Sequence, residues 1–521
     1  MLSSVKVRFS GSFLFSFTIN YDFANKNVVN NVVNDRSKNT ILNIIIYSKV
    51  VYSLRVLEYN RQQFLPRTFS NPSKKLMNTS TINYQAIAQK LAGIETTRDR
   101  DRLTKLSLDY YHFSPILTEQ LQDKRGELAV FPTTEAEVVK IAQICVEQKL
   151  PLTVRGAGTG NYGQCIPLQG GIILDTSKMN QIVELKPGIA TVQPGVRMAA
   201  FDKQAREIGW ELRMAPSTYR TATIGGFIGG GSVGMGSVNY GQISDRGNLR
   251  RVRLVTMEEQ PQVIELRGDE VQKVLHAYGT TGIITELEIA LAPAYPWQEI
   301  IVTFDDFMTA AKFGQTLSDS NGIVKKLVSI HASPIPNYFT TLQNYLPQNK
   351  HCALLMVSEY DFDPFQDLVK EYGGEITYSK SASEAVKGTS LLEFTWNHTT
   401  LHARKVDSSL TYLQTFYFTL ERLEKLYHQA GDEIMIHLEF LRAGDKAVPA
   451  GLQLVRFTTE ARLNEIIRDR ESQGAFIANP HVYTIEDGGN KQIDPAKVAF
   501  KQQVDPYGLL NPGKMRGYDE V

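Results

Sequence analysis

The strongest structural signal in the chain lies in residues 151–164, which are Pro151-Leu152-Thr153-Val154-Arg155-Gly156-Ala157-Gly158-Thr159-Gly160-Asn161-Tyr162-Gly163-Gln164. The apolar start predicts a short strand at Leu152–Val154, and the glycines after it predict a loop. Glycines let backbone N–H groups approach a diphosphate closely, and consecutive amides form a nest for an anion. The stretch therefore predicts a phosphate-binding loop directly after a strand, with Arg155 as a fixed positive charge beside it.

A second glycine-rich segment follows about 60 residues later, where eight of the seventeen residues in Gly225–Gly241 are glycine. Each glycine costs a helix about 1 kcal/mol relative to alanine, so the run predicts no regular helix. Either segment alone is equally well explained by tight turns between strands. Both together favour a large nucleotide cofactor, because side chains suited to hydrogen bonding accompany them: Thr159, Asn161, Gln164, Ser217 and Thr223.

Three motifs match familiar patterns but fail in their context. Gly158–Gly163 fits G-x-G-x-x-G, yet Pro167 prevents the helix that a dinucleotide-binding unit requires after it. Gly230–Gly234 fits G-x-S-x-G, but no helix is predicted after its serine, which disfavours a serine hydrolase. Gly508–Met515 has P-loop spacing with methionine where the magnesium-binding hydroxyl belongs, which argues against a nucleoside triphosphatase. No metal-ligand motif occurs, so no metal is predicted.

Composition excludes several classes of protein. The 521 residues include 56 Lys+Arg and 55 Asp+Glu, a net charge of 56 − 55 = +1, with 42% hydrophobic residues. This is a globular composition without the positive field that nucleic acid binding needs. The three cysteines form no C-x-x-C pair, which favours a reducing, cytoplasmic location.

The length allows two to four domains, and the pattern predicts four segments. Residues 1–76 are predicted to be an extension, either disordered or upstream of a mis-assigned start, with no apolar run long enough to span a bilayer. Residues 77–293 are predicted to form an α+β domain that includes a helix capped by Thr134 and Glu137, and a helix at Asp269–Ala277. Residues 294–490 follow a β-α-β-β-α-β order, and residues 491–521 close the chain.

Seven segments in chain order together resemble one family. They are Phe131–Val138, Pro151–Gly160, Gly170–Asp175, Thr191–Val196, Ala222–Gly226, Gly282–Glu286 and Asp505–Lys514. They are similar to the landmarks of the vanillyl-alcohol oxidase or p-cresol methylhydroxylase (PCMH) type of FAD-binding oxidoreductases, with an FAD domain most like the glycolate oxidase and D-lactate dehydrogenase branch. The resemblance implies an α+β fold, in which a two-part FAD-binding domain carries an α+β cap with a ferredoxin-like core.

The resemblance also implies which residues hold FAD. They are Arg155, Gly156, Gly158, Thr159, Gly160, Asn161, Gly163, Gln164, Pro216, Ser217, Thr223, Gly225, Gly226, Gly282, Ile283, Ile284, Asn511 and Lys514. No histidine lies between Arg155 and Gln164, so FAD is expected to be held non-covalently unless a cap residue forms a link. For Lys514 a solvated terminal lysine is an equal alternative. The metal motif of the lactate branch is missing around Ile434–Phe440, which puts metal-assisted oxidation in doubt.

Candidate catalytic residues lie in the cap segment Trp396–Lys405. His398 and His402 are four residues apart and would share one face of a helix. A histidine is a suitable base for a hydroxyl proton, and Arg404 could clamp a substrate carboxylate. The alternative is a polar cap surface over a buried tryptophan.

Three functions stay open at this point. The first is a soluble FAD-linked oxidoreductase that moves a hydride from a small hydroxylated substrate, carboxylated ones included, to flavin. The second is a flavoenzyme of this fold with reductase or redox-neutral transferase chemistry, and the third is an FAD-binding protein without turnover. The electron acceptor stays open among oxygen, quinone and cytochrome, and so does a homodimer.

Overall fold

The computed structural model describes two compact units, Met1–Asn78 and Thr79–Val521. The described residues are 3–8, 14–19, 82–231, 233–385 and 387–520. In the first unit, β1 (Ser3–Arg8) and β2 (Leu14–Ile19) pair as an antiparallel hairpin, which the sequence did not predict. The rest of the predicted extension 1–76 lies outside the described residues.

A four-stranded sheet opens the second unit. Strands β4 (Leu128–Phe131), β6 (Ile172–Asp175) and β5 (Leu152–Arg155) pair in parallel, and β3 (Glu95–Thr97) joins β4 antiparallel. Parallel strands need crossover connections, and helix α5 (Glu135–Gln148) forms the connection from β4 to β5. Its capping box between Thr134 and Glu137 confirms the predicted helix start. Leu510 bridges to Leu152 in parallel, so the end of the chain returns to the open side of β5.

A six-stranded antiparallel sheet follows, with β11-β10-β12-β8-β7 in order and β9 paired to β12. Its strands are β7 Ile182–Lys186, β8 Ile189–Val192, β9 Trp210–Leu212, β10 Leu249–Val255, β11 Val263–Arg267 and β12 Ile283–Pro293. The predicted helix at Asp269–Ala277 is wrong, because a short 3₁₀ helix, Gly268–Lys273, occupies its start.

A nine-stranded antiparallel sheet follows after three intervening residues, and we refer to residues 294–490, which contain it, as the cap. Its strands are β13 Trp297–Phe304, β14 Lys325–His331, β15 His351–Ser358, β16 Glu375–Lys380, β17 Leu410–Phe416, β18 Ile434–Met435, β19 His437–Ala443, β20 Lys446–Arg456 and β21 Phe476–Ala478. The order β16-β13-β15-β14 continues through β19, β20, β17 and β21. The predicted four-strand unit is therefore part of a larger sheet.

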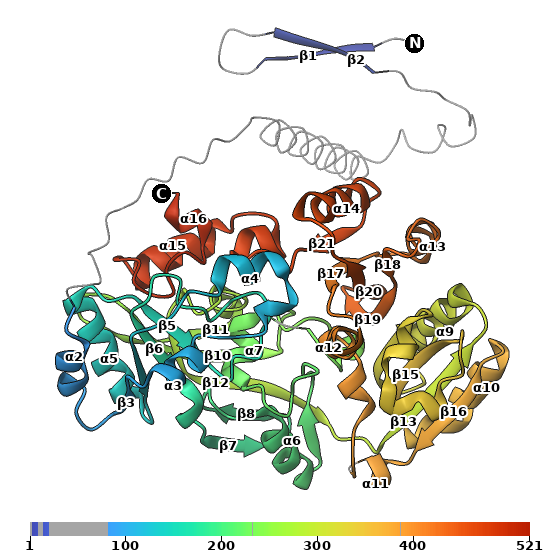
Figure 1. Cartoon of the computed structure of the whole chain (residues 1–521), viewed down its shortest axis with the longest axis horizontal. Coiled ribbons are helices and arrows are strands. Elements are labelled where there is room, and N and C mark those ends of the chain that lie inside the picture. The colour runs from blue at the N-terminus through green and yellow to red at the C-terminus, as the bar shows by residue number, and fades with distance from the viewer. Residues whose placement is uncertain (1–2, 9–13, 20–81, 232, 386, 521) are drawn as a thin grey trace, which may run out of the picture. The chain divides into compact units, whose positions relative to one another are not determined.

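The helices of the second unit lie around and between these sheets. Besides α5 they are α2 Tyr84–Lys90, α3 Arg100–Leu106, α4 Pro115–Leu121, α6 Met198–Glu207, α7 Ile224–Gly230, α8 Ser237–Tyr240, α9 Phe307–Asp319, α10 Phe362–Glu371, α11 Ala382–Ala385, α12 Asn397–Val406, α13 Leu420–His428, α14 Glu460–Ser472, α15 Pro495–Val504 and α16 Arg516–Asp519. In Figure 1, β5–β8 and β10–β12 lie on the left and β13, β15 and β16 on the right, with α12 and β17–β21 between them.

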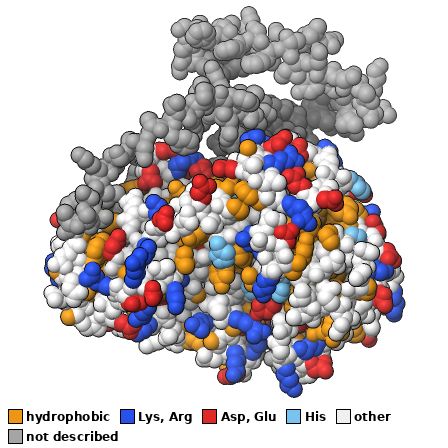
Figure 2. Space-filling view, in the orientation of Figure 1, with side chains coloured by type: hydrophobic (Ala, Val, Ile, Leu, Met, Phe, Trp, Pro, Cys, Tyr) orange, Lys and Arg blue, Asp and Glu red, His pale blue; other side chains and the backbone are white. Residues whose placement is uncertain are grey.

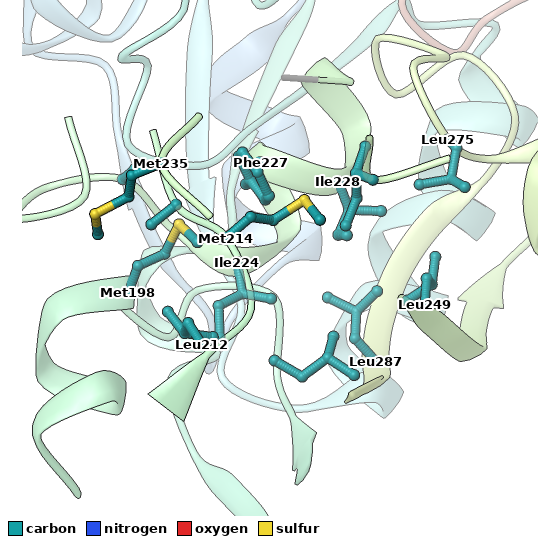
Figure 3. Close-up of a cluster of buried hydrophobic side chains, with 14 of the residues drawn as sticks. Met198, Leu212, Met214, Ile224, Phe227, Ile228, Met235, Leu249, Leu275 and Leu287 are labelled. Carbon is teal, nitrogen blue, oxygen red and sulfur yellow. The ribbon is translucent and has the colours of Figure 1, made fainter. Parts of the chain in front are cut away.

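Helix α7 corrects a sequence prediction, because the glycine-rich segment does hold a helix at Ile224–Gly230. Thr223 caps it by accepting a hydrogen bond from the N–H of Gly226 at 3.3 Å. Ile224, Phe227 and Ile228 are buried, and Figure 3 shows them among the apolar side chains of the neighbouring strands, Leu287 of β12 included. Burial of one apolar face thus stabilises a helix that glycine alone disfavours.

The visible face of the molecule carries positive and negative side chains interspersed, without a region of one sign (Figure 2). That distribution agrees with the near-zero net charge. Among the described residues, no helix combines the length and apolar character that crossing a bilayer requires.

Candidate active site

A cavity of about 550 Å³ opens where the three sheets of the second unit meet. One part of its wall comes from residues 154–284 and includes the loop after β5, helix α7 and the segment around Gly279. The other part comes from the cap and consists of Trp396, Asn397, Gln414, Phe416, Phe418, Leu452, Phe476, Ala478 and Gly489. A volume of this size is typical of ligand and cofactor sites.

Most of the predicted cofactor residues line this cavity. They are Arg155, Gly156, Gly158, Thr159, Gly160, Asn161, Gln164, Pro216, Ser217, Thr223, Gly225, Gly226, Gly282 and Ile284. Gly163, Ile283, Asn511 and Lys514 are not on its wall. Ile283 is fully buried in the apolar core of the first sheet.

The two glycine-rich segments meet directly. A Cβ on Gly156 would overlap the hydroxyl of Thr223, and Gly158 has φ +65° with no room for a side chain beside Arg155. On α7, the glycines lie on the wall of the cavity while Ile224 and Ile228 lie in the core. Bare backbone therefore forms this part of the wall, as a close approach to a diphosphate requires.

The guanidinium of Arg155 forms hydrogen bonds with backbone carbonyls at and near the start of the loop. Its Nη1 donates to the carbonyl oxygens of Leu106 and Leu108, and Nη2 donates to the carbonyl of Ala157 at 3.3 Å. Its Nε lies 3.7 Å from a carboxylate oxygen of Asp175. The side chain is buried, so these contacts hold the start of the loop in place.

Asn511 and Lys514 support the loop from behind. The Asn511 amide donates to the carbonyls of Gln164 and Tyr278, and Lys514 donates to the carbonyl of Gly163. Both side chains are buried, which rules out the solvated terminal lysine as an interpretation. The C-terminal segment therefore ties the glycine-rich loop to the segment that precedes Gly279.

A second charged group lies behind the same loop. Burial raises the pKa of the Asp109 carboxyl to about 7, against the lowering effects of the Tyr111 N–H and of the charge on Lys514. Burial lowers the pKa of the Lys514 amine to about 7, against the opposing charge of Asp109. Sequence analysis did not find Asp109, because only the folded chain brings it near residue 514.

Tyr162 links the loop to the cap. Its hydroxyl donates to the side-chain oxygen of Gln414 on β17 at 2.9 Å, and its N–H donates to Gln164 at 3.2 Å. Burial raises the pKa of the Tyr162 phenol, so it keeps its proton and remains a donor. The contact joins residues 252 positions apart in the chain.

His276 is a wall residue that sequence analysis missed. Its backbone has φ +51°, and its ring nitrogen Nε2 lies 3.3 Å from the hydroxyl of Tyr278. Burial lowers the pKa of His276 to about 4, so the imidazole is neutral at pH 7. Its position six residues ahead of the Gly282–Glu286 segment was the sequence signal for a site residue, although one histidine carries little information by itself.

On the cap side, a buried network holds the start of α12. Trp396 has φ +51°, and its N–H donates to Glu439 at 2.6 Å. The same carboxylate oxygen lies 2.8 Å from His437 Nε2 and accepts from Ser329 at 2.9 Å. This network fixes the Trp396–Asn397 corner, and both of those residues line the cavity.

The three predicted catalytic residues are not on the wall of the cavity. His398 Nδ1 lies 3.1 Å from Glu393, and His402 contacts the Glu393 carbonyl while its ring stacks on Phe394. Arg404 donates to the carbonyls of Leu410 and His112. The predicted helix is present as α12, but it directs these groups to contacts within the fold.

Metal coordination finds no support in the part of the chain that is described. No group of three or more His, Cys, Asp and Glu side chains there is arranged to hold an ion.

Comparisons with known proteins agree with this geometry. Residues 127–263 match the family described as "FAD binding domain". The glycolate oxidase subunit GlcD of Bacillus subtilis (strain 168) is 29% identical over 205 residues, 37% of this chain and 42% of that protein. The chain thus spans about two fifths of that relative's length.

Two solved structures share the fold over most of their length. Alkyldihydroxyacetonephosphate synthase has a TM-score of 0.64 at 15% identity and covers 86% of this chain and 90% of its own. p-Cresol methylhydroxylase with substrate bound has a TM-score of 0.61 at 18% identity, and the match covers 83% of this chain and 96% of that protein.

Residues 127–263, which match the FAD-binding domain, include the glycine-rich loop after β5 and helix α7 on one side of the cavity. The chain shares its fold with p-cresol methylhydroxylase, and the α+β class is the one that the sequence predicted. The glycine backbone on this wall fits a flavin dinucleotide, because Gly156, Gly158, Gly225 and Gly226 line the cavity without side chains that would keep a diphosphate from their amides.

Proposed function

We propose that this protein is an oxidoreductase that transfers a hydride from a CH–OH group of a small molecule to FAD. One observation carries the proposal: a single cavity has bare glycine backbone on one side and an aromatic cap wall on the other. The first side suits the cofactor, and the second is left for a substrate. Bound FAD supplies the two-electron acceptor that protein side chains lack.

The chain's own residues would bind and orient the reactants. The amides of Gly156–Gly160 and the start of α7 would face the diphosphate, held in place by Arg155 and Asn511. Trp396 and Phe416 would exclude water from the reacting carbon. The hydroxyl proton would pass to His276, which lines the cavity and is neutral at pH 7.

We further propose that FAD is held without a covalent bond. Among the described wall residues, the side chains able to form such a link are few. Burial raises the pKa of the Cys165 thiol to about 11, which leaves little thiolate at pH 7. Denaturation followed by filtration should release the yellow colour into the filtrate, and colour retained on the protein would contradict this.

The activity test is anaerobic reduction of the purified holoprotein. Absorbance near 450 nm should be present, and a substrate should bleach it. His398→Ala should reduce within about threefold of the parent rate, because His398 contacts Glu393 and does not line the cavity. A yellow protein that no alcohol reduces would argue against the proposal.

A second candidate is a flavoprotein of this fold with reductase or redox-neutral chemistry. It is favoured by one observation, that none of the described cap residues on the wall can take up or release a proton near pH 7. Reduction by alcohols that fails while FAD stays bound would favour this candidate.

A further inference from the structure

The cap wall of the cavity contains no charged side chain among the described residues. Four of its nine residues are aromatic (Trp396, Phe416, Phe418 and Phe476), two are aliphatic (Leu452 and Ala478), two are neutral amides (Asn397 and Gln414), and one is a glycine (Gly489). Gln414 already accepts a hydrogen bond from Tyr162, which leaves its NH₂ as a donor. The wall therefore offers apolar surface and neutral hydrogen-bonding groups.

The phenyl rings form one cluster that is only partly covered. Phe416 lies 6.3 Å from Phe418 in a stacked arrangement and 5.9 Å from Phe476 edge to face, measured between ring centroids. Phe418 is 43% exposed. Partly exposed aromatic rings grouped in a cavity are typical of a surface that an apolar ligand covers.

Three arginines around the cavity make their contacts with protein carbonyls. Arg422 lies 6.0 Å from the Phe418 ring and donates to the Tyr417 carbonyl at 2.7 Å. Arg404, the predicted carboxylate clamp, donates to two carbonyls outside the cavity, and Arg155 holds the opposite loop. Behind Trp396 lies the Glu439 carboxylate, which accepts from the Trp396 N–H and contacts His437.

We infer that the substrate is an uncharged alcohol with an apolar body, and not a hydroxy acid. A carboxylate bound against this wall would lose its hydration without gaining a charged partner, which is strongly unfavourable. An uncharged alcohol would cover the phenyl cluster and keep hydrogen bonds to the neutral amides. This inference rests on the proposed function, because it assigns the cap wall to the substrate.

Binding of matched probes to the holoprotein tests the inference without turnover. Isothermal titration calorimetry would compare 1-phenyl-1,2-ethanediol with mandelate, which differ mainly by the carboxylate. The diol should bind roughly 100-fold more tightly. Mandelate binding as tightly as the diol, or no binding of either up to its solubility, would overturn the inference.

A charge placed on the rim gives a second measurement. Phe418→Arg should improve mandelate binding at least tenfold and weaken the diol, whereas Tyr360→Arg, which is exposed and off the cavity, should change neither. An unchanged preference in Phe418→Arg would count against the assignment of the wall. If the diol binds but never bleaches the flavin, the proposed oxidation is contradicted and the proposed substrate class is supported. If mandelate bleaches the flavin faster than the diol does, the oxidation is supported and the substrate class is contradicted.

Discussion

At the scale of single residues, Lys514 illustrates a side chain whose role only its surroundings define. It lies behind the glycine-rich loop, with its amine on the Gly163 carbonyl and its charge opposed by Asp109. Burial of both groups brings their pKa values together near 7, so each depends on the other for its charged form.

Lys514→Met should therefore make stability depend more steeply on pH. Without the lysine, the folded pKa of Asp109 rises further above its unfolded value, so the folded state binds the proton more tightly and loses stability as pH rises. We expect a loss of about 1–3 kcal/mol at pH near 8.5, measured by urea unfolding. The double variant Asp109→Asn/Lys514→Met should recover most of it; an additive loss would show that the two groups act independently.

At the scale of elements, α7 has two faces with opposite requirements. Its apolar residues pack in the core, and its glycines form the cavity wall. Gly229 has no atom within 4 Å of the position that a Cβ would take. A methyl group there would therefore fit in the protein without FAD, but it would lie at the cavity wall.

Gly229→Ala should separate stability from cofactor binding. The protein freed of FAD should gain up to about 1 kcal/mol from helix propensity. The dissociation constant for FAD should rise several-fold, measured by fluorescence titration. Gly322→Ala, which is also unobstructed but lies outside the cavity, serves as the control. Unchanged FAD affinity in Gly229→Ala would place the cofactor away from α7.

The C-terminal segment Leu509–Asn511 is the second element that shapes the site. Leu152 donates to the Leu509 carbonyl at 2.8 Å, and the N–H of Asn511 donates to Leu152 at 2.7 Å. Asn511 sits at φ +42°, where its side chain reaches both the Gln164 and Tyr278 carbonyls.

Asn511→Ala should cost about 1–3 kcal/mol of unfolding free energy, because it leaves buried carbonyls without a donor. It should also weaken FAD binding, because the loop loses its support. Asn349→Ala is the matched control. Asn349 is an exposed asparagine with φ +63°, so its replacement tests only the cost of placing alanine at a positive φ. Equal losses in the two variants would assign the effect to the backbone and not to the amide.

At the scale of the whole molecule, buried histidines join distant parts of the chain. His481 lies 2.8 Å from the Ser114 hydroxyl at the start of α4 and 2.9 Å from the Tyr412 carbonyl on β17. Burial lowers the pKa of His481 and of His276 to about 4.

Stability should therefore fall as pH drops below 6.5. Below pH 6.5 these histidines are protonated in the unfolded chain, whereas in the folded chain they stay neutral until about pH 4. This difference lowers the free energy of unfolding by roughly 1 kcal/mol per histidine at pH 5.5. Urea unfolding at pH 7.5 and 5.5 measures this. His481→Gln keeps hydrogen-bonding groups and should lower the pH dependence, whereas His428→Gln, at an exposed position, should not. Equal slopes in all three proteins would contradict the prediction.

The sequence by itself determined the α+β class, most strands, the glycine-rich loop after β5 and the order of the cap elements. These follow from local information: glycine spacing, apolar alternation, and turn residues act within a few positions of each other. The same locality explains one error, since the glycine cost that argued against α7 is offset by core contacts from other segments.

Only the tertiary structure decided which side chains face the cavity. His398 and Arg404 have the right chemistry in sequence, but Glu393 and the carbonyls of Leu410 and His112 engage them. Gln414 and Phe416 have no motif, yet β17 brings them to the wall opposite Tyr162. The physical reason is that orientation within a site depends on packing between residues hundreds of positions apart, which local sequence patterns do not record.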